Sequence, residues 1–109
     1  MKRWTSWPVR AVVVAGESMT PTFRPGDCLL VRADARIRVG DVVLARHPSI
    51  AGLLLVKRAT RREVAGWWLS SDNAALGLDD SRAFGVLPAE LVVGRVLFRY
   101  YPWRPRRRA

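Results

Sequence analysis

Residue types that often build metal or catalytic sites are scarce in this chain of 109 residues, which has one Cys, one His and two Lys. A single thiol, Cys28, excludes an intramolecular disulfide and fits a reducing compartment. The only His, His47, lies nineteen positions from Cys28, and this pair forms no recognisable set of metal ligands. We therefore expect no metal site and no cofactor.

Long apolar runs are also missing from the start of the chain, where the longest run covers residues 11–15. Five residues are too few to cross a membrane or to form the apolar centre of a signal peptide. The sequence therefore predicts no membrane span, and a cytoplasmic location follows as the default expectation.

Charge is strongly one-sided, with a formal net charge of +10, and residues 104–109 carry four of these charges. The length and this charge run predict one domain over residues 1–103 and a basic, disordered tail over residues 104–109. A basic β-domain that binds nucleic acid stays open as an alternative function. A solubilising tail is the simpler interpretation, so nucleic acid is not the expected partner.

Turn residues recur along the chain, and the runs between them are rich in Val and Leu, which favours short strands. Two segments, RPGDCLLVR and RVGDVVLAR, share a Gly-Asp turn that leads into an apolar strand. Short helical pieces are expected only after Ser18 and over residues 88–91. We predict a mainly β fold, a small irregular folded sheet or half-barrel, with strands at residues 11–15, 28–32, 41–46, 53–61, 66–70 and 92–100.

The segment GESMTPTF, residues 16–23, presents Ser18 between a glycine and a turn at the end of the first predicted strand. An ordinary turn is one interpretation. The other is a serine nucleophile, which needs a base elsewhere because a hydroxyl is a weak nucleophile until its proton is removed. Gly16 would then let backbone approach a substrate, and the Ser18 amide is a candidate oxyanion donor.

Lys57 is the candidate base, since it is the only lysine beyond Lys2 in a chain that otherwise uses arginine for positive charge. Arginine keeps its proton, whereas a desolvated lysine can lose it. Strand alternation predicts Leu53, Leu55 and Lys57 on one face, with Arg58 on the other. Burial on that apolar face would lower the pKa of Lys57 from about 10.4 toward the ~7–8 of a general base.

A Ser-His-Asp site that uses His47 is the competing assignment. His47 precedes Pro48 at the end of a predicted strand, which is typical of an exposed loop position. We therefore favour Lys57 as the base.

The block from Ser71 to Gly85 is rich in Asp, Asn and Gly and is predicted to be a long loop. Asp80, Ser81 and Arg82 can form a charge-assisted cluster that holds this loop beside a site. We interpret the block, including Asp72 and Asn73, as structural support, and the aromatic pairs as packing residues.

Four boxes, GESMTPTFRPGDCLLV, GDVVLARHP, LLVKRA and SDN…DDSRAFGVLPAELVVGRV, stand in this order in the sequence. They resemble the conserved boxes of the signal peptidase I and self-cleaving repressor family of Ser/Lys proteases. Within it, the compact chain, together with the segment LLVKRATRREVAGWWLSSDN, is similar to the nickel-type superoxide dismutase maturation proteases. The resemblance implies a protein substrate, a dismutase precursor that loses its N-terminal propeptide; signal-peptidase-like processing of another precursor is the alternative.

By position, the resemblance implies Ser18 as nucleophile, Lys57 as general base, and Gly16, Met19 and Pro21 as oxyanion and turn support. It also implies an extended substrate bound along backbone strands. These strands are residues Val13, Val14, Ala15, Leu54, Leu55 and Val56. The supporting loop would contribute Asp72, Asn73, Asp80, Ser81 and Arg82.

The chain departs from the family pattern at two places. Gly16 stands where some signal peptidases have an oxyanion-hole hydroxyl, so backbone amides would take that role. Leu78 and Asp79 stand where a hydroxyl that orients the lysine is often found, and Ser71 replaces a usual glycine.

Overall fold

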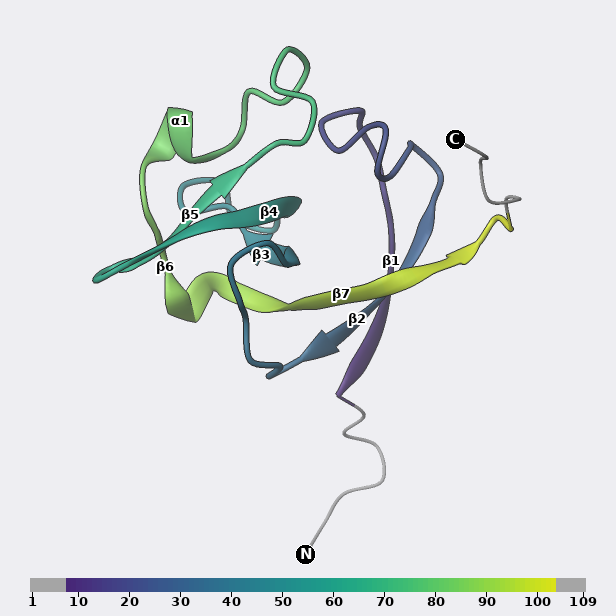
Figure 1. Cartoon of the computed structure of the whole chain (residues 1–109), viewed down its shortest axis with the longest axis horizontal. Helices are drawn as coiled ribbons and strands as arrows, with labels where there is room; N and C mark the ends of the chain where they lie inside the picture. Colours follow the sequence, from purple (N-terminus) through teal and green to yellow (C-terminus); the bar gives the residue numbers. More distant parts are fainter. Residues whose placement is uncertain (1–7, 104–109) are drawn as a thin grey trace, which may run out of the picture.

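The computed structural model describes residues 8–103, so the predicted tail at residues 104–109 lies outside the described residues. Within that range seven strands pair into one antiparallel sheet in the order β1-β2-β7-β3-β4-β5-β6. The sheet curls, with β7 running between β1 and β2 on one side and β3 to β6 on the other (Figure 1). The predicted mainly β half-barrel is confirmed.

The element bounds follow the predicted strands closely at most positions. The strands are β1 (Val9–Val13), β2 (Cys28–Ala33), β3 (Val42–Arg46), β4 (Leu54–Glu63), β5 (Gly66–Ser70), β6 (Leu87–Pro88) and β7 (Val92–Tyr101). The helical elements are α1 (Ser81–Phe84) and η1 (Ala89–Leu91), the latter a 3-10 turn.

Three sequence predictions differ from this structure. The first strand ends at Val13, so Val14 and Ala15 follow β1, although Val14 N still donates to Asp27 O at 2.8 Å. The segment after Ser18 forms turns instead of a helix. Within the predicted loop, α1 forms because the Asp80 carboxylate accepts from Arg82 N and caps the helix.

The two Gly-Asp turns work in the same way. Asp27 Oδ2 accepts from Arg24 N, and Asp41 Oδ2 accepts from Arg38 N, both at 2.8 Å. The glycine before each aspartate has a positive φ, which residues with a side chain rarely adopt. In both places the turn leads directly into a strand, since β2 begins after Asp27 and β3 begins after Asp41.

The curl of the sheet comes from register shifts in its long strands. The β2 and β7 ladder shifts twice, and single shifts occur between β3 and β7 and between β4 and β5. Such irregularities bend and twist a strand. At Gly94 of β7 the crossing is so close that a Cβ atom would lie 2.3 Å from Arg32 O, so only glycine fits there.

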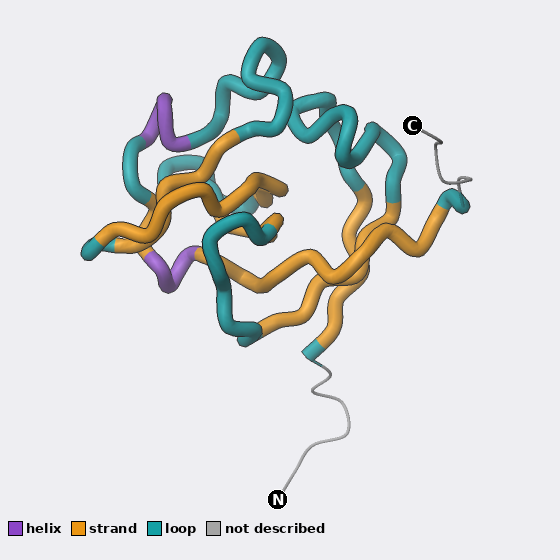
Figure 2. The backbone as a smooth tube through the Cα atoms, in the orientation of Figure 1, coloured by secondary structure: helices purple, strands orange, loops and turns teal. Residues whose placement is uncertain are grey.

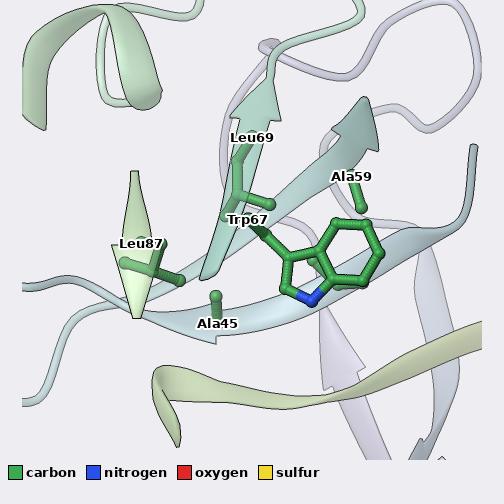
Figure 3. Packing of buried hydrophobic residues seen from close by; sticks show 6 residues of the cluster. Ala45, Ala59, Trp67, Leu69 and Leu87 are labelled. Carbon is green, nitrogen blue, oxygen red and sulfur yellow. The ribbon is translucent and has the colours of Figure 1, made fainter. Parts of the chain in front are cut away.

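The hydrophobic core is formed mainly by residues of β3, β4 and β5. Trp67 and Leu69 of β5 pack with Ala45, Ala59 and Leu87 in a buried cluster (Figure 3). Trp67 is thus a packing residue, as predicted. Ala59 of this core lies on the same face of β4 as Lys57, so the core holds the part of the strand that carries the candidate base.

The loops after β1 and after β5 lie next to each other at the rim of the curled sheet (Figure 2). Asn73 N donates to Ser18 O at 2.7 Å and joins the two loops directly. In residues 8–103, no helix has the length and apolar character needed to cross a membrane.

Candidate active site

A cleft of about 530 Å³ lies between the segment after β1, the first half of β4 and the loop at residues 76–79. Ser18 and Lys57 both line it. The other lining residues are mostly apolar and include these predicted site residues: Val13, Val14, Ala15, Gly16, Met19, Leu54, Leu55 and Val56.

Lys57 is nearly removed from solvent, with 3 % of its surface exposed. It alternates with exposed Leu54 and half-buried Val56 on β4, so the predicted division of faces holds. Desolvation lowers the pKa of Lys57; the carboxylates of Asp80 and Asp79 oppose this shift, and Arg82 adds to it. The cleft therefore contains an amine that releases its proton more readily than an exposed lysine does.

Within residues 8–103, the Lys57 side chain has one side-chain hydrogen-bond partner, since Nζ donates to Ser71 Oγ at 3.1 Å. Ser71 Oγ in turn donates to Gly77 O at 3.1 Å. In the sequence Ser71 stands out only because a glycine is usual at that position, and no pattern there predicts its contact with Lys57.

Ser18 lies in the turns that follow β1, and it is half-buried. The neighbouring Met19 is buried, with 1 % exposed, and anchors the turn in the interior. Met19 O accepts from Phe23 N at 2.8 Å, and Glu17 O accepts from Thr20 N at 3.2 Å. These bonds hold the turn that carries Ser18 at the cleft wall, and exposed Pro21 continues the same turn.

Asp72 connects both walls of the cleft. Its carboxylate takes a bidentate pair of bonds from Arg58, at 2.8 Å from Nε and 2.7 Å from Nη2. It also accepts from Thr22 Oγ1 at 2.6 Å, in the turn after Ser18. The Arg58 bonds hold the pKa of Asp72 below its usual range. Asn73 adds a second link, since Nδ2 donates to Thr20 Oγ1 at 2.8 Å.

Asp80, Ser81 and Arg82 hold the loop against the end of β5. Ser81 Oγ accepts from Leu69 N at 2.8 Å, and Asp80 Oδ2 accepts from Ser71 N at 3.1 Å. Burial works against ionisation of Asp80, but the bonds from Arg82 and Ser71 outweigh it and lower its pKa. This is the compact charge-assisted cluster expected from the sequence.

A family model described as Peptidase S24-like matches residues 4–83. The chain belongs to this peptidase family. It is 31 % identical to the mitochondrial inner membrane protease subunit 1 of Xenopus tropicalis, over 84 % of this chain and 68 % of that one. The human protein of the same name is 28 % identical, over 84 % and 69 %. The family predicted from the four sequence boxes is confirmed.

In this peptidase, His47 takes part in a turn and not in the cleft lining. Its Nδ1 accepts from Ser49 N and Ile50 N, both at 3.0 Å, and its ring meets Phe84 edge to face at 5.3 Å. Among residues 8–103, no group of three or more His, Cys, Asp or Glu side chains could hold a metal ion.

Gly16 and Gly77 both line the cleft but differ in their surroundings. A Cβ atom added at Gly16 would have nothing within 4 Å. At Gly77 it would lie 2.0 Å from Ser71 Oγ and 2.8 Å from Ser18 Cβ. A side chain can therefore be added at Gly16, whereas at Gly77 it would displace the groups around Lys57.

Proposed function

We propose that this peptidase is a serine endopeptidase in which Ser18 is the nucleophile and Lys57 is the general base. The observation that carries the proposal is the burial of Lys57 in the cleft that Ser18 also lines. Desolvation favours the neutral amine, and a neutral amine can take the proton of a serine hydroxyl.

The proposed reaction has two halves. As Ser18 Oγ attacks the scissile carbonyl carbon, its proton passes to Lys57 Nζ, and the oxyanion forms near the Ser18 amide. The Lys57 ammonium then gives that proton to the leaving amine, which departs as the peptide bond breaks. Lys57 next takes a proton from water as the water oxygen attacks the acyl ester, and it returns that proton to Ser18 Oγ as the ester bond breaks.

Two open strand edges support an extended substrate. β1 stands at one end of the strand order and pairs with β2 within the described chain. Leu54 to Lys57 pair with β3, but β5 joins β4 only from Arg58 onward. Backbone groups of both segments are therefore available to an added peptide strand, and both segments line the cleft.

We further propose the precursor of a nickel-type superoxide dismutase as the substrate, with removal of its N-terminal propeptide. The support for this choice is the resemblance of the segment LLVKRATRREVAGWWLSSDN, residues 54–73, to the maturation proteases of these dismutases. A cytoplasmic location belongs to the same proposal, and the single thiol of Cys28 fits such a reducing compartment. The relatives are named for the mitochondrial inner membrane, so cell fractionation is the direct test of location.

The test is incubation of the full chain with the dismutase precursor, followed by sequencing of the new N-terminus. Ser18→Ala and Lys57→Ala should each abolish cleavage while circular dichroism shows an unchanged fold. Cleavage that persists in Ser18→Ala would reject Ser18 as nucleophile. Cleavage of a signal-peptide precursor but not of the dismutase precursor would reject the substrate and keep the peptidase mechanism.

A further inference from the structure

We propose that Ser71 is the positioning residue for Lys57, and that this role depends on glycine at position 77. The inference rests on the proposed function, because it assigns a partner to the proposed base. Ser71 is buried, with 8 % of its surface exposed, and its hydroxyl takes part in two hydrogen bonds.

The direction of these hydrogen bonds suits a base. A serine hydroxyl has one proton, and Ser71 donates it to Gly77 O at 3.1 Å. Ser71 Oγ can then only accept from Lys57 Nζ, which lies 3.1 Å away. A neutral amine that donates one N–H to Ser71 keeps its lone pair available for the proton of Ser18.

Ser71 is itself held from two sides. Its backbone N donates to Asp80 Oδ2 at 3.1 Å. The carbonyl that accepts its hydroxyl proton, Gly77 O, also accepts from Arg82 Nη2. Because Asp80 and Arg82 are paired with each other, backbone and side chain of Ser71 are both fixed by one ion pair. A fixed acceptor restricts the rotamers of a lysine that otherwise has four flexible side-chain bonds.

Gly77 is needed for space and not for its backbone conformation. Its φ lies outside the positive range that favours glycine. A Cβ atom there would lie 2.0 Å from Ser71 Oγ and 2.3 Å from Ser71 Cβ. Contacts this short are incompatible with packed atoms, so a side chain at position 77 would push Ser71 away from Lys57. The same Cβ atom would lie 2.8 Å from Ser18 Cβ, so it would also disturb the proposed nucleophile.

The experiment compares Ser71→Ala with a matched control, Ser70→Ala, in cleavage of the dismutase precursor or of a peptide that spans its cleavage site. Ser70 is the last residue of β5 and directly precedes Ser71, and its Oγ lies 3.0 Å from Thr60 Oγ1. We expect Ser71→Ala to lower kcat by about 10- to 100-fold with little change in KM, since the base loses alignment and the substrate strands remain. Ser70→Ala should match the parent.

The pH profile separates positioning from a purely structural role. The charged groups that act on Lys57 are Asp79, Asp80 and Arg82, and all remain in Ser71→Ala. Loss of an acceptor for the ammonium should therefore move the acidic limb of kcat to lower pH. An unchanged limb with a lowered melting temperature would overturn the positioning role.

Further outcomes separate the role of Ser71 from the proposed roles of Ser18 and Lys57. If Ser18→Ala and Lys57→Ala are inactive but Ser71→Ala has parental kcat, the inference fails and the proposed function stands. If Ser71→Ala is inactive and Ser18→Ala cleaves, Ser71 is the nucleophile and both fail. Gly77→Ala should fold, lose about 100-fold or more in kcat and move the acidic limb of kcat to lower pH, as Ser71→Ala does. Displacement of Ser18 alone would lower kcat without moving the limb. Parental activity or an unmoved limb in Gly77→Ala would therefore overturn the dependence on glycine.

Discussion

The two walls of the cleft are built in opposite ways. Ser18 stands on a run of turns and is half-buried, with Gly16 and Glu17 exposed beside it. Lys57 stands on a strand whose cleft segment is paired with β3, and it is almost fully buried. A nucleophile must reach a substrate, whereas a lysine base must avoid water to release its proton at moderate pH. The difference in burial suits the two proposed roles.

The walls are not independent, because the loop after β5 contacts both of them. Asp72 bonds to Arg58 on the β4 wall and to Thr22 on the turn wall. Ser71 bonds to Lys57, and Asn73 N bonds to Ser18 O. Three consecutive residues, Ser71, Asp72 and Asn73, therefore fix the position of the exposed wall relative to the buried wall.

The largest effect should come from a side chain at position 57 that cannot release its positive charge. Lys57→Arg keeps a positive charge that cannot be released, so we expect loss of all cleavage. Burial of the larger charged group should also lower the free energy of unfolding by about 3 kcal/mol or more. Urea unfolding and the precursor assay measure the two effects. An active Lys57→Arg would show that Lys57 does not act as a base.

Separating the two walls should have the next largest effect. Asp72→Asn removes the charge that pairs with Arg58 and weakens the link to Thr22, and we expect a loss of about 1–2 kcal/mol in stability. The cost is limited because the Arg58 side chain is 31 % exposed and partly screened. Activity should fall more than in Thr60→Ala, a control outside the cleft lining. Equal activity in both variants would argue that the link does not align the walls.

Loss of the Lys57 proton as the pH rises should increase both the activity and the stability of the protein. Because the folded pKa of Lys57 is lowered, the unfolded chain binds this proton more strongly, and the free energy of unfolding rises with pH between the two pKa values. In Lys57→Met this rise disappears. The stability difference between Lys57→Met and the parent should thus shrink as pH rises toward about 10.4.

Activity of the parent should rise with pH through the lowered pKa of Lys57, since only the neutral amine accepts the Ser18 proton. Initial rates on the precursor across this range measure the effect. A rate that is flat from acid to alkaline pH would contradict a titrating base.

The smallest effect should come from the exposed wall. Gly16→Ser adds a hydroxyl where a Cβ atom meets nothing within 4 Å, so stability should change by less than about 0.5 kcal/mol. We expect kcat to rise by up to about tenfold if the hydroxyl reaches the oxyanion. Gly16→Ala separates the hydroxyl from the added methyl group. A fall in kcat in both variants would show that the open space is needed by substrate.

Apolar alternation and turn chemistry are local, and they predicted six of the seven strands of the described chain and the faces of β4. The two-residue β6 and the single turn of α1 carry too few residues for a periodic pattern. The helix expected after Ser18 was wrong, since turns form there, and Pro21 disfavours helical backbone at the residue before it.

Ser71 shows why the partner of Lys57 could not be predicted. The β4 and β5 hairpin is regular from Glu63 to Arg61, and then its register shifts by one residue before Ala59. Without that shift the ladder would bring Asp72, and not Ser71, opposite Lys57. The irregularity depends on how the curled sheet packs, which no local pattern in the sequence records.

The open edges of β1 and β4 also bear on how the protein behaves at high concentration. An unpaired strand edge accepts a strand from any extended chain, including a second copy of the same protein. The formal net charge of +10 opposes such pairing through repulsion between copies. Since salt screens this repulsion, solutions of the enzyme without substrate should self-associate more readily as ionic strength rises.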